Sequence, residues 1–228
     1  MAKVLTVISN GYKTDGYETG WWGEELFVPK EILENAGHEV VLASPEGGKA
    51  EIDKLSLSDE ADPNGEFKAL YLKGIANDTK KLKEVFPKEY DAILIVGGHG
   101  AMFDLTKNEE LEKTINTIYE TGGIVAAECH GPAALIWTKD QNGKSIIAGK
   151  QVTGYPEKME PEEIKEYLPF SLEEELSKIA DYDSDLDKEA LGYWADNQII
   201  TSRGPESSRL MGEELVRALS ELPLDRPR

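Results

Sequence analysis

The sequence predicts an α/β fold: a doubly wound, flavodoxin-like, mostly parallel sheet with helices on both faces and a small helical lid. Two observations predict it. Short β-branched runs alternate with longer segments of helical periodicity, which is typical of parallel strands joined by crossover helices. Several of these runs are apolar nearly throughout, as strands covered on both faces should be. No linker divides the 228 residues, so we expect a single domain over residues 1–228.

Six β-branched segments are expected to form the strands, namely residues 3–9, 39–43, 92–96, 124–127, 151–153 and 199–201. Helical spacing marks residues 24–36, 105–121 and 206–221, and the second of these carries Leu111, Ile115 and Ile118 on one face. Gly37 and Gly122-Gly123 follow two of the helices, where left-handed C-caps belong.

Two polar stretches are expected to lie outside this core. Residues 45–90 contain the turn signals Gly47-Gly48 and Pro-Asn-Gly at 63–65, and a charged helix-like piece around 82–86. We interpret them as an insertion over the core. Residues 157–189 are acidic and are interrupted by prolines 161 and 169, yet apolar residues recur at helical spacing, which predicts a helical lid. These apolar residues are Ile164, Leu168, Leu172, Leu176 and Ile179.

Composition excludes several classes of function. Forty-four acidic against 25 basic residues give a formal charge of −19, which repels phosphate backbones and anionic lipids, so we expect neither nucleic-acid nor membrane partners. No apolar run approaches the roughly 18 residues of a membrane helix. The single cysteine cannot form an internal disulfide, which fits a reducing compartment, and we expect a cytoplasmic protein.

That cysteine, Cys129, follows an apolar strand and precedes a helix-like segment, as a nucleophile at a sharp elbow does. Such a turn leaves the N–H of the next residue, His130, free to stabilise an oxyanion. A thiol at a helix N-terminus also has its thiolate favoured by the helix dipole. The alternative is a small buried hydrophobe. Flanking by His130, Gly131 and Pro132 rather than by apolar residues favours the nucleophile.

A second cluster, Gly97-Gly98-His99-Gly100, directly follows the most apolar strand. Consecutive glycines let backbone amides approach a ligand closely, so the Gly98 N–H could join that of His130 in an oxyanion hole. The run lacks the spacing of a dinucleotide-binding loop and has no Walker lysine, so no nucleotide cofactor is expected.

The three histidines, His38, His99 and His130, restrict the chemistry further. A cysteine protease or a class I glutamine amidotransferase needs a histidine well downstream of its nucleophile, and none follows His130. The histidines are spread singly and show no metal-ligand spacing, so we expect no metal site. His38 precedes a strand and is interpreted as structural.

Several separated motifs resemble one known family. They are Ala-Glu-Cys-His-Gly-Pro at 127–132, Gly-Gly-His-Gly at 97–100, Thr-Gly-Trp-Trp-Gly-Glu-Glu at 19–25, Ala-Ser-Pro-Glu-Gly-Gly at 43–48 and Ala-Gly-Lys-Gln-Val-Thr-Gly at 148–154. Together they resemble the ThiJ/PfpI superfamily, specifically its branch of glutathione-independent glyoxalase III enzymes and heat-shock chaperones. The resemblance covers nearly the whole chain.

The resemblance implies roles for particular residues. A glutamate of the first helix would share a proton with Cys129; the matching position is Glu25, with Glu24 as its rival. An acid beyond the next strand would orient His130. It matches Glu160, and the neighbouring glutamates at 157 and 163 are alternatives. The substrate and its oxyanion would lie against Gly97, Gly98, His99 and Gly131.

The implied activity is conversion of methylglyoxal to lactate through a hemithioacetal on Cys129, by a homodimer that uses no nicotinamide, metal or glutathione. Two alternatives remain open at this point. One is a stress-induced holdase chaperone that binds unfolded chains through apolar surface. The other is a deglycase or another small-molecule hydrolase that uses the same thiol.

Overall fold

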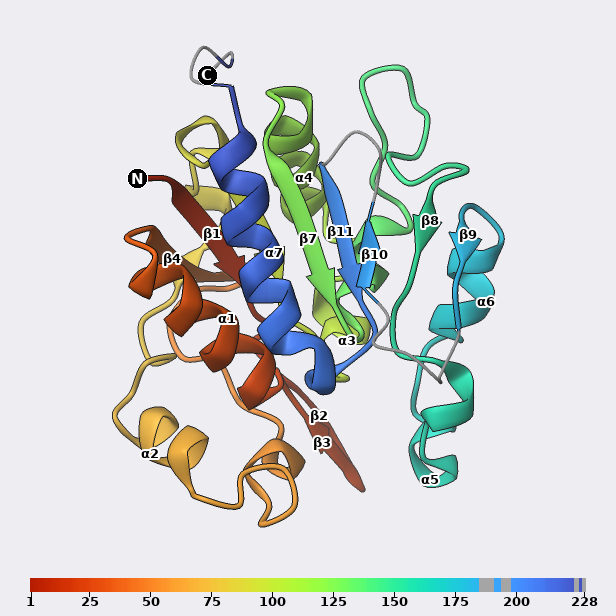
Figure 1. Cartoon of the computed structure of the whole chain (residues 1–228). Helices are drawn as coiled ribbons and strands as arrows, with labels where there is room; N and C mark the ends of the chain where they lie inside the picture. The colour runs from red at the N-terminus through yellow and green to blue at the C-terminus, as the bar shows by residue number, and fades with distance from the viewer. Residues whose placement is uncertain (185–190, 194–197, 224–225, 227–228) are drawn as a thin grey trace.

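The structure, a computed structural model, describes residues 1–184, 191–193, 198–223 and 226. A seven-stranded sheet forms its centre (Figure 1), with the strands β1 (Lys3–Val7), β4 (Glu39–Ser44), β5 (Lys80–Lys81), β6 (Ala92–Ile95), β7 (Ile124–Glu128), β10 (Leu191–Tyr193) and β11 (Ile199–Ser202). Their order is β10-β11-β7-β6-β1-β4-β5. Neighbouring strands are parallel except β10, which is antiparallel to β11. The predicted doubly wound, mostly parallel sheet is confirmed.

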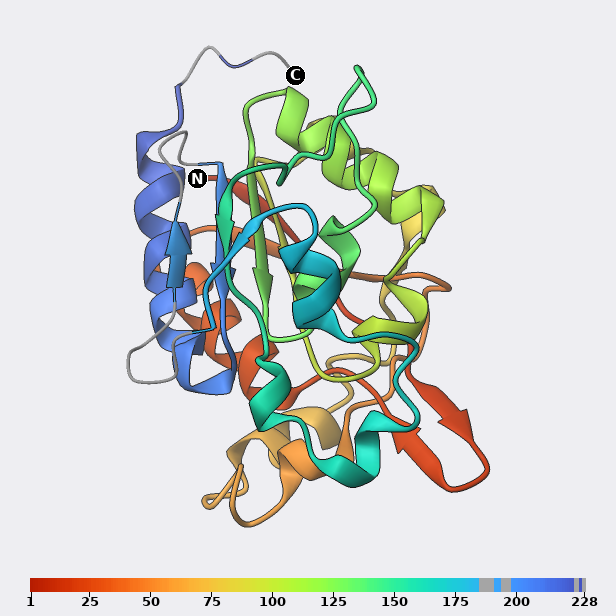
Figure 2. The same ribbon diagram turned by 90° about the vertical axis from the view of Figure 1, so that its right-hand side faces the viewer.

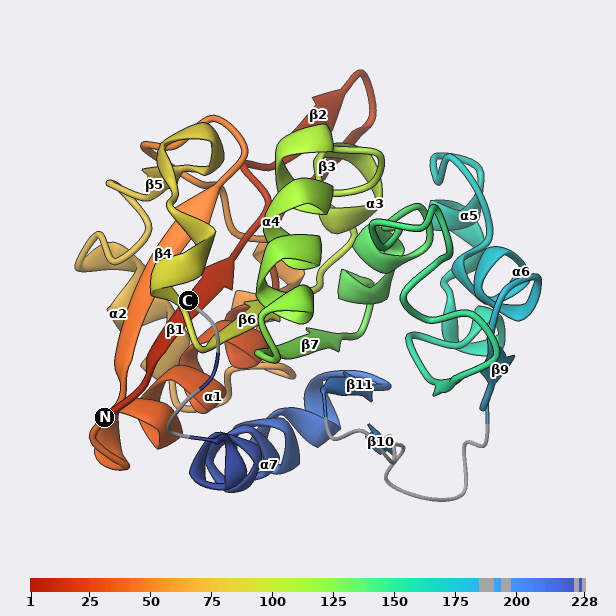
Figure 3. The ribbon, with the colours of Figure 1, turned by 90° about the horizontal axis from the view of Figure 1, so that it is seen from above.

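Helices cover both faces of this sheet. In Figure 3, α1 (Gly23–Asn35) and α7 (Ser208–Glu221) lie on one side and α4 (Glu109–Glu120) on the other. The helix expected from residue 105 begins only at Glu109, because Asn108 caps it by accepting the N–H of Leu111 and Lys107 has a positive φ of 53°. Gly37 and Gly122 take the left-handed conformation expected after α1 and α4.

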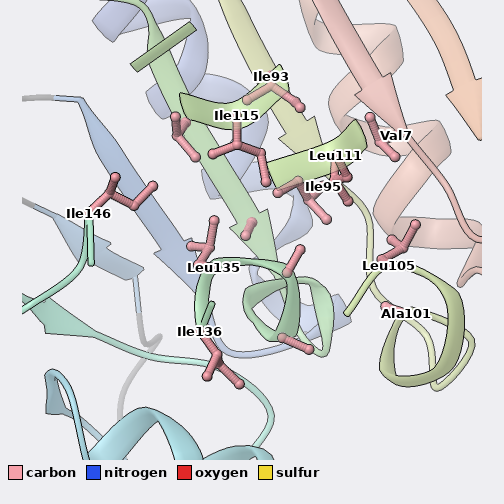
Figure 4. Packing of buried hydrophobic residues seen from close by; sticks show 14 of the residues in the cluster. Val7, Ile93, Ile95, Ala101, Leu105, Leu111, Ile115, Leu135, Ile136 and Ile146 are labelled. Atoms are coloured by element: carbon pink, nitrogen blue, oxygen red, sulfur yellow. The ribbon is translucent and has the colours of Figure 1, made fainter. Parts of the chain in front are cut away.

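Side-chain alternation along the central strands produces a core on each face. Val7, Ile93 and Ile95 pack toward α4 and its residues Leu111 and Ile115 (Figure 4). The intervening strand residues belong to a second buried cluster with α1 and α7; it includes Val4, Leu94, Ala126, Leu26, Met211 and Leu215. Burial on both faces explains why the strands are apolar nearly throughout.

One predicted strand lies elsewhere. Residues 151–153 form β8 (Gln151–Val152), but β8 pairs with β9 (Asp181–Tyr182) in a separate two-stranded sheet. The edge of β11 that β8 would need is occupied by β10. Thr153 instead reaches β11 through its N–H, which donates to the side-chain oxygen of Thr201 at 2.9 Å.

The predicted insertion contains more structure than its sequence indicated. Besides β5 it holds η1 (Lys54–Leu57), α2 (Glu66–Leu72), η2 (Leu82–Glu84) and η3 (Pro87–Glu89). The helix-like piece around residue 82 is thus a single 3₁₀ turn. A hairpin that was not predicted, β2 (Tyr12–Thr14) and β3 (Tyr17–Thr19), projects away from the sheet, as the red ribbon of Figure 2 shows.

The acidic segment forms the expected lid in short pieces: η5 (Glu157–Met159), α5 (Glu162–Lys165) and α6 (Leu172–Ser177). It lies beside the edge of the sheet that β10 forms (Figures 1 and 2). Ile164, Leu172 and Leu176 are buried, which confirms the apolar periodicity. Residues 185–189 of the predicted lid lie outside the described residues. Within the described part of the chain, every helix is too short or too polar to cross a membrane.

Candidate active site

Cys129 stands at a strained turn directly after β7. Its φ is +58°, in the left-handed region that residues other than glycine rarely adopt. Two hydrogen bonds fix its backbone: its N–H donates to the carbonyl of Ser202 at 2.9 Å, and its carbonyl accepts the N–H of Tyr155 at 2.8 Å. The expected elbow is therefore present. The following segment, η4 (Gly131–Leu135), is a five-residue 3₁₀ helix and not an α-helix, which weakens the predicted dipole contribution.

Gly131 is required by close packing between η4 and β6. A Cβ atom on this residue would lie 2.4 Å from the carbonyl oxygen of Ile95. We therefore expect Gly131→Ala to lower the free energy of unfolding by about 1–3 kcal/mol, because a strand or the elbow has to shift. Chemical denaturation followed by circular dichroism measures this. An unchanged free energy of unfolding would mean that the elbow and β6 can move apart without destabilising the fold.

A chain of contacts runs from the thiol to the lid. Cys129 Sγ lies 3.3 Å from Nδ1 of His130, and Nε2 of His130 lies 2.5 Å from Oε1 of Glu160. All three side chains are buried. An ionised carboxylate only accepts hydrogen bonds, so the Nε2 of His130 carries the hydrogen and its Nδ1 can accept the thiol proton. Burial, and then the neighbouring His99, lowers the pKa of His130, against the effect of Glu160, and favours this neutral form.

Glu160 also binds the second histidine of the site. Its Oε2 lies 2.8 Å from Nε2 of His99, and the centroids of the two imidazoles are 4.3 Å apart. Burial alone would raise the pKa of Glu160, but hydrogen bonds from His130 and His99 lower it to about 2. The sequence predicts His99 beside the substrate or its oxyanion; in the structure its ring contacts Glu160 and lies beside the ring of His130.

The rival acids of the lid have other partners. Glu157 accepts a hydrogen bond from Ser171 and donates its own N–H to Glu173, whereas Glu163 is exposed. Glu160 can reach the histidines because it follows the short turn η5, in extended backbone conformation. Among the three predicted acids, the geometry thus singles out Glu160.

Glu25 also contacts the thiol of Cys129 and is fully buried. Its Oε2 accepts the N–H of Gly97 at 2.8 Å. Burial raises its pKa to about 8, although hydrogen bonds from Cys129 and Gly97 act in the other direction. Glu25 is consequently protonated at neutral pH and can exchange a proton at the sulfur. Its rival Glu24 is only half-buried, and burial followed by Glu206 raises its pKa.

The thiolate expected from the sequence is not the resting form. Burial, and then the charge of Glu25, raises the pKa of Cys129 well above its ordinary value. The backbone amide of Gly98 opposes this shift. Because Gly98 has a φ of +87° and a Cβ there would lie 2.5 Å from the carbonyl of Gly20, only glycine brings this amide to the sulfur. Cys129 therefore needs a base to become nucleophilic.

The predicted site residues all lie near Cys129. Gly97 is the most tightly packed against it, because an added Cβ atom would lie 2.6 Å from Glu25 Oε2 and 2.7 Å from Cys129 Cβ. A cavity of about 170 Å³ opens on the lid side of Glu160. Residues of the lid and its entry line it: Tyr155, Glu157, Glu160, Lys165, Leu168, Phe170, Ser171, Leu172 and Glu173.

Three further residues of this region have no role predicted from the sequence. The ring of Tyr155 packs against His130 with centroids 4.8 Å apart. Glu128, fully buried beside the nucleophile, accepts the hydroxyl of Ser208 at 2.6 Å. Asp104, which ends the short helix after the glycine run, is partly buried and accepts the N–H of Asn10 at 2.7 Å. Glu128 was detectable as a charged residue within an otherwise apolar strand, a pattern that marks a special position.

Comparison with known proteins identifies the family of this chain. The DJ-1/PfpI family profile matches residues 19–218. The chain belongs to the DJ-1/PfpI family. This confirms the resemblance found in the sequence motifs.

Among curated DJ-1/PfpI relatives, the glutathione-independent glyoxalase hsp3101 of Schizosaccharomyces pombe is 37% identical over 164 residues, which are 67% of each chain. Glyoxalase 3 of Candida albicans is 28% identical over 234 residues, 96% of this chain and 98% of the relative. The crystal structure of glyoxalase III from Candida albicans superposes with a TM-score of 0.83 at 28% identity, covering 95% and 97% of the two chains. The Rapid Encystment Protein 24 KDa of Francisella tularensis gives 0.87 at 33% identity, covering 96% and 99%.

Proposed function

We propose that this DJ-1/PfpI protein is a glutathione-independent glyoxalase that converts methylglyoxal to lactate, with Cys129 as its nucleophile. The observation that carries the proposal is the position of the Cys129 thiol between a base, Nδ1 of His130 at 3.3 Å, and a protonated carboxyl group, Glu25. Relatives that align over nearly the whole chain carry the name glyoxalase.

In the first step His130 takes the thiol proton on Nδ1, and Sγ forms a bond to the aldehyde carbon, C1. The carbonyl electrons move to the oxygen, which becomes an oxyanion facing the amides of Gly98 and His130. Glu25 or His130 supplies a proton to this oxygen, which completes a hemithioacetal. Glu160 holds the imidazole in the required tautomer and stabilises its cation.

In the second step a proton leaves C1 and the oxygen on C2 takes a proton, so the C–H electrons form the double bond of an enediol. A proton is then added at C2 while the hydroxyl group on C1 loses its proton and becomes a carbonyl. The product is a thioester of 2-hydroxypropanoic acid, in which C1 has been oxidised and C2 reduced by the same electron pair. Water then adds its hydroxyl group to C1 and returns a proton to the sulfur, which releases lactate. Glu25 and His130 are the groups placed to carry these protons.

The test is lactate formation from methylglyoxal by the purified protein in the presence of EDTA and without glutathione, with heat-inactivated protein as the control. We expect lactate, and in D₂O we expect deuterium at C2, because the enediol takes that proton from exchangeable groups. If no lactate forms while glycated amines or short peptides are hydrolysed, the deglycase or hydrolase alternative replaces the proposal. Lactate with only protium at C2 would replace the enediol step with a hydride shift.

Glu25→Gln is expected to lower kcat by about 10²–10⁴-fold. Glutamine keeps the size of the side chain and can still accept the Gly97 N–H, but it cannot exchange a proton with Cys129. Steady-state kinetics from pH 6 to 9 measures the effect. Glu24→Gln is the matched control and should stay within about tenfold of wild type. Equal losses in the two variants would contradict the assignment of Glu25.

The proposal extends to assembly and location: a homodimer in the cytoplasm, acting on a small reactive aldehyde. Sedimentation equilibrium tests the first part. A monomer at micromolar concentration that still forms lactate would remove the dimer from the proposal and leave the chemistry intact.

A further inference from the structure

Three buried groups near the nucleophile meet at one point. Nε2 of His99 and Nε2 of His130 each face one oxygen of the Glu160 carboxylate, at 2.8 Å and 2.5 Å. These ligand-type atoms all lie within 4.8 Å of one another, and no other such group was found among the described residues. Residues 30 and 61 positions apart in the chain form it, so ligand spacing in the sequence could not reveal it.

The donor set is one that transition metals prefer. Two neutral imidazole nitrogens and one carboxylate oxygen bind zinc tetrahedrally and leave a fourth position open. The cavity of about 170 Å³ on the lid side of Glu160 is lined by three carboxylates, those of Glu157, Glu160 and Glu173, and by one ammonium group, that of Lys165. This acidic lining, on a chain of net charge −19, attracts hydrated dications to the carboxylate.

We propose that His99, His130 and Glu160 form a binding site for a divalent transition-metal ion of the zinc type, which inhibits the enzyme by replacing the hydrogen bonds among these three residues. With bonds of about 2.0–2.1 Å, ligand atoms of a tetrahedral zinc site lie about 3.3 Å apart. The two N···O separations, 2.8 and 2.5 Å, are shorter, so Glu160 must withdraw by roughly half an ångström to admit the ion. It stands in extended backbone just after a three-residue turn of the lid, where such a shift is local.

Inhibition follows from the tautomer of His130. In the metal-free site Nε2 carries the hydrogen and Nδ1 accepts the proton of Cys129, 3.3 Å away. A metal bond to Nε2 uses the lone pair of that nitrogen, so its proton moves to Nδ1 through water. The Nδ1–H then donates to the sulfur and can no longer accept a proton from the thiol. The metal ion itself forms no bond to Cys129, and no group is oxidised or reduced.

Metal binding itself does not depend on the proposed glyoxalase activity; only the inhibitory effect rests on it. The first experiment therefore measures Zn²⁺ binding by calorimetry to metal-free Cys129→Ala protein, in which the thiol cannot be a ligand. We expect one ion per chain. Adding His99→Asn to this background should weaken binding at least about tenfold, because one of three ligands is lost. His38→Asn is the matched control, since this histidine accepts the N–H of Ala2 outside the site, and it should leave the affinity unchanged.

The second experiment separates metal on the imidazoles from metal on the sulfur. In wild-type protein, saturating Zn²⁺ should stop lactate formation and slow alkylation of Cys129 by iodoacetamide, because Nδ1 of His130 can no longer take the thiol proton. Co²⁺ in place of Zn²⁺ should bind without a thiolate-to-cobalt charge-transfer band. A charge-transfer band of this kind would place the metal on the sulfur and overturn the inference.

Two further outcomes would also overturn it: no stoichiometric binding to Cys129→Ala, or equal affinity with and without His99. Thermal unfolding of the His99→Asn variant, and a parallel His99→Gln variant, guard against loss of binding through misfolding. If wild-type protein forms no lactate at all, the proposed function fails, yet calorimetry with His99→Asn still decides the metal site.

Discussion

Cys129→Ala is expected to reduce lactate formation from methylglyoxal at least about 10³-fold, to the level of a protein-free control. The reason is specific to this site. Every covalent step of the proposed reaction takes place at Sγ, and the neighbouring groups His130 and Glu25 both interact with the sulfur. Chiral quantification of lactate under initial-rate conditions measures the loss, and it also reports which enantiomer the wild type makes.

Two further variants make this result interpretable. Cys129→Ser keeps a hydroxyl beside His130 and should retain no more than trace activity, because an alcohol is a far weaker nucleophile than a thiolate. His38→Asn changes a histidine remote from the sulfur and should behave as wild type. If Cys129→Ala retains more than a tenth of wild-type activity, the lactate does not arise through a hemithioacetal on this residue.

Asp104→Asn should change how stability depends on pH. Burial raises the pKa of Asp104 to about 7, from a value near 3.8 in the unfolded chain. Between these two values the folded state binds more protons than the unfolded state, so the free energy of unfolding falls as pH rises from about 4 to 7. Asparagine does not titrate, so the variant lacks this decline. The difference in unfolding free energy between pH 4 and pH 7.5 should shrink by on the order of 3 kcal/mol.

Urea denaturation of wild type and variant at both pH values measures this difference. The buried carboxyls of Glu25 and Glu128 have raised pKa values as well, so wild type should lose further stability that the single substitution leaves in place. Asp59→Asn, at an exposed position, is the control and should leave the pH dependence unchanged. Parallel curves for wild type and Asp104→Asn would mean that Asp104 ionises normally within the fold.

The sequence predicted the parts of the fold that periodicity controls. Strands buried on both faces, such as Ala92–Ile95, are apolar throughout and are unambiguous. It did not predict the partners of two-residue strands such as β8, because so short a ladder depends on which sheet edge remains available. The β2–β3 hairpin was also missed, since three-residue strands carry too few positions for alternation to be visible.

The site was predicted as a set of residues but not as an arrangement. Cys129, His130 and Gly98 follow neighbouring parallel strands, whose carboxyl ends meet at one edge, so their proximity could be inferred. The contact between His99 and Glu160 could not, because it depends on how the lid folds back over the sheet. The raised pKa of Cys129 was missed for a related reason: burial outweighs a helix dipole, and sequence does not report the burial of one side chain.

The lid contributes Glu160 to a site whose other members stand on the central sheet and on α1. Activity therefore depends on a local equilibrium as well as on the global one. Each transient detachment of residues 157–177 takes the carboxylate away from both imidazoles while the sheet, with its two buried layers, stays intact. The active arrangement is held by the free energy of docking the lid, which is smaller than the free energy of global unfolding. Heat or denaturant would then inactivate the enzyme through a partly open state. In that state most of the backbone amides remain protected from hydrogen exchange.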